Sequence, residues 1–288
     1  MQRTAQTGAL NQSGRIQASA VLGLLHLMMI LFCAITVFPV IYSILVSLAP
    51  PRMGMLRIVP EEFFFGHYVR LFSHGQFPRY ILNSVINAGG GTVISTIFSA
   101  MAGYAVSRIA FKGKNLVFGY MFFMLMLPQL TNIVPLYKIA SDLGMINTYT
   151  LMIIVFGAYG VPLAVFIMKG FFDSIPKVLE EAAFIDGATA FQTFWKVVMP
   201  VCAPGIVATL LINFVYSWNN FFTPLILITT SSMKMATVGL YDFQHVLEGN
   251  QDELLAAACV VIMVPSILLF LATRKYFLRG IVEGAVKG

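Results

Sequence analysis

The stretch that decides the fold is residues 20–48, AVLGLLHLMMILFCAITVFPVIYSILVSL, which contains no Asp, Glu, Lys or Arg. An α-helix needs about 20 predominantly apolar residues to cross the hydrocarbon core of a bilayer, so this run predicts a membrane-spanning helix. Pro39 predicts a kink in it or marks its outer part. Five further apolar runs follow at residues 81–107, 116–136 (interrupted by Pro128 and Pro135), 149–168, 203–228 and 254–273. The sequence therefore predicts an all-α polytopic membrane protein with six transmembrane helices.

The composition of the whole chain agrees with this fold class. Of its 288 residues, 58% are hydrophobic and 10% are charged, whereas a soluble domain is about 45–50% apolar and about 25% charged. These fractions exclude a disordered chain, a coiled coil and most soluble enzymes. The three cysteines and four histidines show no spacing typical of a metal site, a disulfide framework or an intramembrane metalloenzyme. We therefore expect no metal ion and no cofactor bound by this chain.

The basic residues predict the orientation in the membrane. Of the 18 Lys and Arg residues, twelve fall in the N-terminal segment and in 108–115, 169–202 and 274–288, and the other six fall in the intervening segments. Because positively charged loops stay in the cytoplasm, both termini are expected there, as six spans require. The predicted parts are a cytoplasmic tail (1–19), a six-helix domain (20–279) and a second cytoplasmic tail (280–288). No run of basic residues with interleaved aromatics occurs, so nucleic acid is not an expected partner.

Small residues recur at every fourth position of the second apolar run. They are Gly91, Ser95, Ser99, Gly103 and Ser107. Residues four apart lie on one face of a helix, and a stripe of small side chains lets the backbone of another helix approach closely. Small residues are also common in membrane helices generally, but five in register favour a helix-packing face.

A long segment after the fourth run is too patterned for a simple cytoplasmic turn. Residues 171–204 read FFDSIPKVLEEAAFIDGATAFQTFWKVVMPVCAP. The Asp173-Ser174 pair can cap a helix that begins near Pro176, and Gly187 ends or bends that helix. A second amphipathic stretch follows at residues 190–199. We interpret the segment as two short surface helices, which either fill a groove in a soluble partner or simply cover the helix bundle.

Several positions of this segment together resemble the EAA loop in permease subunits of binding-protein-dependent ABC importers. They are Glu181-Ala182-Ala183, Asp186-Gly187-Ala188, Phe194 and Pro200. Val197 and Met199 depart conservatively from the Ile and Leu that are usual in the family. The similarity extends over residues 20–288 and includes the YAVSR stretch at 104–108. The chain most resembles the six-span inner permease of the maltose-transporter type, in the carbohydrate-uptake branch.

The resemblance implies which residues couple transport to ATP hydrolysis. In the family the EAA loop is a coupling helix that docks in a cleft of the ATP-binding subunit. The matching residues here are Glu181, Ala182, Ala183, Asp186 and Gly187. The C-terminal tail of such relatives reaches between two ATPase subunits, which implies contacts of Arg279 and Lys287 there. ATP and Mg²⁺ belong to those partners, because this chain has no G-x-x-x-x-G-K-[ST] motif, and the chain is not expected to be an enzyme.

The resemblance also implies an assembly in the inner membrane of a bacterium. Its other members would be a second, homologous permease, two ATP-binding subunits and a solute-binding protein that docks outside, near the loop at residues 230–253. The transported solute would be a sugar or oligosaccharide, neutral or acidic, moved by alternating access. A non-sugar solute such as a polyol phosphate is one alternative. An ATP-independent secondary transporter is another, although no Asp, Glu, Lys or Arg falls well inside a predicted span to form its relay.

Polar side chains inside the spans are the candidates for lining the pathway, because they are costly to bury in lipid. Amides suit sugar hydroxyl groups, and aromatic faces suit the C–H surfaces of sugar rings. The candidates are Asn132, Asn213, Tyr216, Trp218, Asn219 and Asn220, with Asn83, Asn87 and Gln129 also considered. Each of them could equally hold neighbouring helices together.

Overall fold

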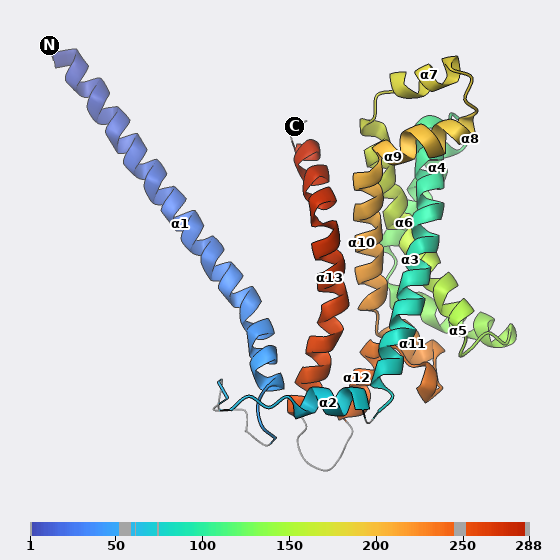
Figure 1. Ribbon diagram of the computed structural model, residues 1–288. Helices are drawn as coiled ribbons and strands as arrows, with labels where there is room; N and C mark the ends of the chain where they lie inside the picture. The colour runs from blue at the N-terminus through green and yellow to red at the C-terminus, as the bar shows by residue number, and fades with distance from the viewer. Residues whose placement is uncertain (1, 52–58, 61, 74, 245–251, 286–288) are drawn as a thin grey trace. The chain divides into compact units, whose positions relative to one another are not determined.

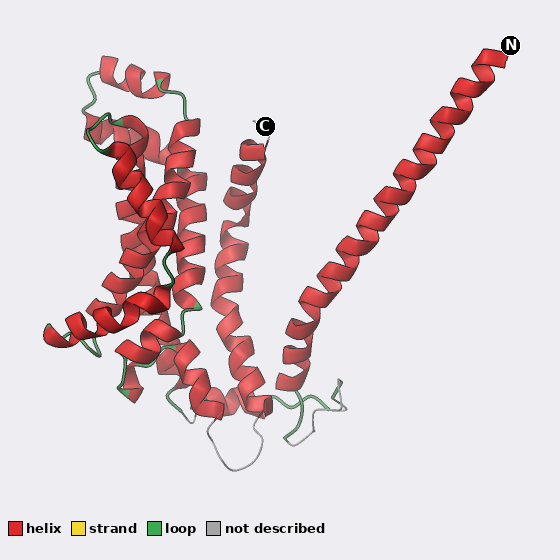
Figure 2. Cartoon of the chain, turned by 180° about the vertical axis from the view of Figure 1, so that it is seen from behind, coloured by secondary structure: helices red, strands yellow, loops and turns green. Residues whose placement is uncertain are grey.

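The computed structural model describes residues 2–51, 59–60, 62–73, 75–244 and 252–285. Within these ranges all regular structure is helical, and loops join the helices (Figures 1 and 2). The all-α membrane fold class is thereby confirmed. The chain divides into two units, Met1–His67 with Asn250–Val260 and Tyr68–Gly249 with Val261–Gly288. Each unit is described by itself.

The first unit consists mainly of α1 (Gln2–Ser47). Its stretch Val21–Ser47 is long and apolar enough to cross a membrane, and Pro39 lies inside the helix without ending it. Beyond the helix, the Phe64 N–H donates a 2.8 Å hydrogen bond to the carbonyl of Leu48. Because α1 begins at Gln2, the segment predicted as a tail (residues 1–19) is helical and continuous with the first span.

Three helices form the centre of the second unit. Helix α3 (Phe77–Arg108) packs along α6 (Tyr149–Ser174), and α10 (Ala203–Trp218) packs against both (Figure 1). Both α3 and α6 are long and apolar enough to cross a membrane, as is the Asp252–Tyr276 stretch of α13 (Asp252–Ala285). The prolines inside α6 and α13 do not end these helices.

The contact between α3 and α6 depends on small residues. A Cβ atom added to Gly91 would lie 2.5 Å from the Cβ of Phe156, and one added to Gly103 would lie 3.0 Å from the Cβ of Met168. Ser95 and Ser99, between these glycines, are fully buried. The structure thus places the small-residue stripe of α3 on the face that α6 covers.

The third predicted span is bent in the structure, and a second bend joins the stretch predicted as a surface helix (residues 190–199) to the fifth span. Helix α4 (Lys114–Met126) is followed by a 3-10 turn and α5 (Ile133–Asp142), and the two parts meet at 99°. Leu127 is extended (φ −75°, ψ 127°), as the residue before a proline prefers, so Pro128 ends α4 where the sequence suggested one interrupted run. The helical stretch Ala190–Val201 joins α10 at 77°.

The fifth predicted run, residues 203–228, is also divided. Helix α10 ends at Trp218, and a separate helix α11 (Phe222–Leu227) follows. The described part of the chain therefore holds four continuous candidate spans, or up to six if each bent pair counts as one span.

The remaining described helices are short and fall between the candidate spans in the sequence. They are α2 (Gly66–Ser73), α7 (Val178–Ile185), α8 (Ala190–Thr193), the π-helical turn η2 (Phe194–Val198), α9 (Met199–Val201), the 3-10 turn η3 (Ser231–Met233) and α12 (Ala236–Gln244). Helix α7 and the α8–α9 segment correspond to the two predicted surface helices and lie together at one end of the second unit (Figure 1).

Candidate functional site

Helix α7 presents an apolar surface to its surroundings. Val178, Leu179, Phe184 and Ile185 are all exposed, and Ile185 is 86% exposed. The helix is bounded by two backbone features: Ile175 is extended before Pro176, and Gly187 has φ +83°. An exposed row of large apolar side chains on a short helix is typical of a surface that a partner covers.

The residues singled out in the EAA motif do not share one orientation. Glu181, Ala182, Asp186 and Gly187 are exposed, whereas Ala183 is only 8% exposed and packs toward the chain's own interior. The two alanines therefore face opposite environments. Only Ala182 is accessible on the described chain to a docking partner.

The predicted start of this helix differs from the structure. Asp173 and Ser174 belong to the last turn of α6, and the N-cap position of α7 is Lys177, which makes no capping hydrogen bond with its side chain. Asp173 instead accepts a 2.5 Å hydrogen bond from the Ser107 hydroxyl and forms a 2.5 Å ion pair with Lys169. Capping propensity could not reveal these partners from α3 and α6.

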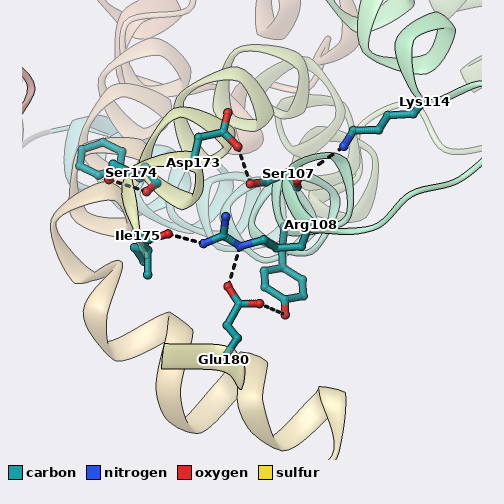
Figure 3. A network of polar contacts seen from close by, with 9 residues as sticks. Ser107, Arg108, Lys114, Asp173, Ser174, Ile175 and Glu180 are labelled. Atoms are coloured by element: carbon teal, nitrogen blue, oxygen red, sulfur yellow. Dashed lines mark hydrogen bonds and ion pairs between the residues drawn. The ribbon is translucent and has the colours of Figure 1, made fainter. Parts of the chain in front are cut away.

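A buried ion pair joins α7 to the end of α3 (Figure 3). Arg108 Nε lies 2.5 Å from Glu180 Oε1, and the two side chains are 8% and 9% exposed. Arg108 Nη2 also donates to the carbonyl of Ile175 at 2.7 Å, and the Tyr104 hydroxyl donates to Glu180 Oε2 at 2.9 Å. The sequence analysis missed Glu180, because nothing in the Glu180-Glu181 pair indicates which carboxylate points inward.

An apolar cluster adjoins this ion pair through Tyr104 and Ile175. It contains Ala100, Met168, Phe172, Ile175, Phe194, Val198 and Cys202, with Tyr104 packed against it. The Tyr104 ring is 4.9 Å from that of Phe194 and 5.6 Å from that of Phe172, measured between centroids. The α8 helix that leads into this cluster begins with a capping box formed by Thr189 and Gln192, as its sequence pattern permits. The surface helices thus pack against a well-packed apolar cluster.

The candidate pathway residues fall into two groups. Asn213 and Trp218 are buried: Asn213 Nδ2 donates to Ser95 Oγ at 2.8 Å, and Trp218 Nε1 donates to the carbonyl of Ile262 at 3.0 Å. These contacts match the helix-packing role that the sequence left open. Asn132, Tyr216 and Asn219 are exposed on the described chain.

Asn220 belongs to a hydrogen-bonded group that connects two helix breaks. The Gln129 amide donates to Thr223 Oγ1 at 3.1 Å and accepts from Asn220 Nδ2 at 3.4 Å. Gln129 follows the break at Pro128, and Asn220 lies between α10 and α11. Side-chain hydrogen bonds therefore link the break between α4 and α5 to the break between α10 and α11.

The other end of α3 holds the loop that was predicted to lie outside. Asn83 Nδ2 donates to the carbonyls of Ser232 and Lys234, at 3.1 and 2.9 Å, and Tyr80 donates to Asp242 at 3.2 Å. The described part of the 230–253 loop is thus attached to α3.

The predicted C-terminal tail is described only in part. Helix α13 extends to Ala285, so part of the predicted 280–288 tail is helical. The side chain of Arg279 and all of Lys287 lie outside the described residues. Among the side chains that are described, no group of three or more His, Cys, Asp and Glu is arranged to hold a metal ion.

Comparison with protein families gives a match over most of the chain. Residues 96–283 match the family described as binding-protein-dependent transport system inner membrane component.

Curated proteins similar to this chain are transport permeases. The trehalose/maltose transport system permease protein MalG of Thermococcus litoralis is 34% identical over 263 residues, covering 90% of this chain and 94% of the relative. The arabinooligosaccharides transport system permease protein AraQ of Halalkalibacterium halodurans is 34% identical over 260 residues, covering 88% and 92%. A probable ABC transporter permease, YurM of Bacillus subtilis, is 35% identical over 230 residues, covering 80% and 76%.

Among solved structures, the fold is similar to a chain in a bacterial ABC transporter involved in the import of the acidic polysaccharide alginate. The TM-score is 0.78 at 22% identity, covering 90% of this chain and 98% of the other. At this level of identity the likeness shows a shared fold.

Proposed function

This chain belongs to the family of binding-protein-dependent transport system inner membrane components, and we propose that it is one of two permease subunits of an ATP-driven sugar importer. The observation that carries the proposal is the similarity to sugar permeases over nearly the whole chain. The family match confirms the resemblance seen in the sequence, and it identifies a multi-pass protein of the inner membrane.

The proposed solute is a sugar or oligosaccharide delivered by a solute-binding protein. Trehalose/maltose and arabinooligosaccharide permeases are among the relatives, which supports carbohydrate over a polyol phosphate or another solute. The fold shared with an alginate importer keeps an acidic oligosaccharide within the proposal. Another solved relative of the fold (TM-score 0.58) is an alginate transporter in complex with a periplasmic protein that holds an alginate pentasaccharide, which supports delivery by a binding protein.

The proposed coupling element is the exposed face of α7. Its apolar residues together with Glu181 and Ala182 would enter a cleft of an ATP-binding subunit, while Ala183 holds the helix against the permease itself. In this proposal α7 and both termini lie on the cytoplasmic side, as the distribution of Lys and Arg predicts, and the tail residues Arg279 and Lys287 would lie near the ATPase dimer. ATP and Mg²⁺ would be bound by the partner subunits, and this chain would bind no cofactor. The exposed apolar row on α7 is the structural support for this placement.

The proposed mechanism is alternating access. ATP closes the ATPase dimer, α7 is displaced with it, and the two permeases change from an inward-open to an outward-open arrangement that receives the sugar. Hydrolysis resets the assembly. The exposed polar residues Asn132, Tyr216 and Asn219 remain the candidates for the pathway surface of this subunit.

The test is to purify the tagged chain from its native membrane and to identify the proteins that accompany it by mass spectrometry. We expect an ATP-binding subunit and a second, longer permease. Proteoliposomes holding that complex should take up the ligand of the co-expressed binding protein only when ATP is supplied. A chain that purifies alone and transports without ATP would overturn the proposal in favour of a secondary transporter.

A further inference from the structure

We propose that the buried Arg108–Glu180 ion pair is the joint that transmits displacement of α7 to the α3–α6 helix pair. Both residues are then positioning residues for ATP-coupled transport. This inference rests on the proposed function, because it concerns how a coupling helix is attached to the permease.

The segments that join α7 to α6 and to α8 are not helical. On its N-terminal side, a short link containing extended Ile175 and Pro176 separates it from α6. On its C-terminal side, Gly187 at φ +83° leads to α8, and a Cβ added to Gly187 would meet nothing within 4 Å. Helix α7 is therefore not a continuation of α6 or of α8. The outer face of α7 is exposed, as Ile185 illustrates.

The Arg108 side chain ties three helices together at one point. It extends from the last residue of α3, pairs with Glu180 in the first turn of α7, and donates to the carbonyl of Ile175, which caps α6. A cation suits the C-terminal ends of α3 and α6, and a carboxylate suits the N-terminal end of α7. The second carboxylate oxygen is occupied by the Tyr104 hydroxyl. Both carboxylate oxygens and the guanidinium thus have fixed partners.

Burial makes this joint stiff. With side chains only 8% and 9% exposed, the pair is poorly screened by water, and either charge alone would be left uncompensated. A displaced α7 therefore carries Arg108 with it more readily than it breaks the pair. The nearby Lys169–Asp173 pair does not do this, because it lies within α6 and its side chains are 28% and 42% exposed.

The helices that would receive the displacement, α3 and α6, are closely packed. Gly91 and Gly103 bring α3 so close to α6 that an added Cβ would clash with Phe156 and crowd Met168. At the far end of α3, Asn83 holds the backbone of the loop at Ser232 and Lys234. A movement applied at Arg108 is thus carried along α3 to the opposite end of the unit.

The experiment uses the complete transporter in proteoliposomes, with both permeases, the ATPase subunits and the binding protein. Solute transported per ATP hydrolysed is measured for Arg108→Gln, Glu180→Gln and the double variant. The single variants leave a buried charge unpaired, so we expect lower thermal stability. The double variant leaves no orphan charge and should regain stability. Its transport per ATP should still fall, by roughly five- to 150-fold, the span of typical coupling free energies.

A purely structural role also predicts recovered stability for the double variant, but with recovered transport per ATP. That result would overturn the proposal that the Arg108–Glu180 ion pair transmits the displacement of α7. Should the double variant fail to assemble, Arg108→Lys decides, because it keeps the charge but lacks the guanidinium fork that reaches Glu180 and Ile175 together. We expect a stable complex with reduced transport per ATP, and a wild-type ratio in that variant would equally refute the proposed role of the ion pair.

Lys169→Gln, which removes an ion pair within one helix, is the matched control and should leave the amount of solute transported per ATP unchanged. Absence of ATP-driven uptake by the wild-type complex would instead count against the proposed function.

Discussion

The contact between α3 and α6 can be tested by adding one methyl group at either of two nearby glycines. Gly91→Ala places a Cβ 2.5 Å from the Cβ of Phe156 and 3.2 Å from the backbone nitrogen of Gly157. Gly89→Ala, on the same helix, places a Cβ with no atom within 4 Å. The two variants therefore share the chemical change and the helix, and they differ in whether α6 is in the way.

The structure gives the expected magnitude. Replacing Gly by Ala inside a helix gains about 0.8–1.0 kcal/mol, and both variants share this gain. Adding a methylene-sized group to a packed interior costs about 1–3 kcal/mol. The upper part of this range applies to Gly91→Ala, because the obstructing atoms are a Cβ and backbone rather than the end of a flexible side chain. The free energy of unfolding of Gly91→Ala should therefore be about 2–3 kcal/mol lower than that of Gly89→Ala.

The assay is thermal denaturation of the purified transporter in detergent, followed by size-exclusion chromatography of the surviving complex. The midpoint temperature of Gly89→Ala should match or slightly exceed that of the wild type. Gly91→Ala should lose half of its complex at a temperature several degrees lower. Equal midpoints for the two variants would refute the close α3–α6 contact on which the packing argument depends.

Three further predictions concern the surface helices. Thr189→Ala removes the side chain that accepts from the Gln192 N–H and should lower the unfolding free energy by about 1 kcal/mol in the same thermal assay. Gly187→Ala should cost about 1–2 kcal/mol, because φ is +83° there and no neighbouring atom contributes; an unchanged midpoint would mean that the turn can rearrange. Ala183→Leu should abolish ATP-driven uptake while membrane levels of the chain stay normal, since Ala183 lies on the buried face of α7 and a larger side chain there would displace the helix; normal uptake would contradict the packing of this face against the permease.

The apolar runs predicted the helical membrane fold, but they could not predict where a helix breaks. Hydropathy is averaged over about 20 residues, so a break of a few residues between α4 and α5 does not lower the average enough to be seen. Proline did not supply the missing signal. Pro39, Pro162 and Pro265 all lie inside continuous helices, whereas Pro128 ends one. At Pro128 the broken conformation has a partner to stabilise it, because Gln129 bonds across to Thr223.

The candidate site was predictable where a helical period governs it. The four-residue spacing indicated a packing face on α3, and the structure places Gly91, Ser95, Ser99 and Gly103 against its neighbours. The ion pair was not predictable in this way. Successive residues of a helix point about 100° apart, so Glu180 faces inward and Glu181 outward, but both orientations fit the apolar pattern of so short a helix. The partners of the inward carboxylate, Arg108 and Tyr104, lie far away in the sequence.

The division of the polar residues in the spans bears on the need for a second subunit. Asn213 and Trp218 satisfy their hydrogen bonds inside the chain, so lipid never meets those groups. Tyr216 and Asn219 remain exposed on α10 and at its end. Polar groups facing hydrocarbon are costly, and membrane proteins place them against protein or water. The exposed side of α10 is therefore expected to face another polypeptide or an aqueous pathway rather than lipid, which agrees with the proposed pair of permease subunits.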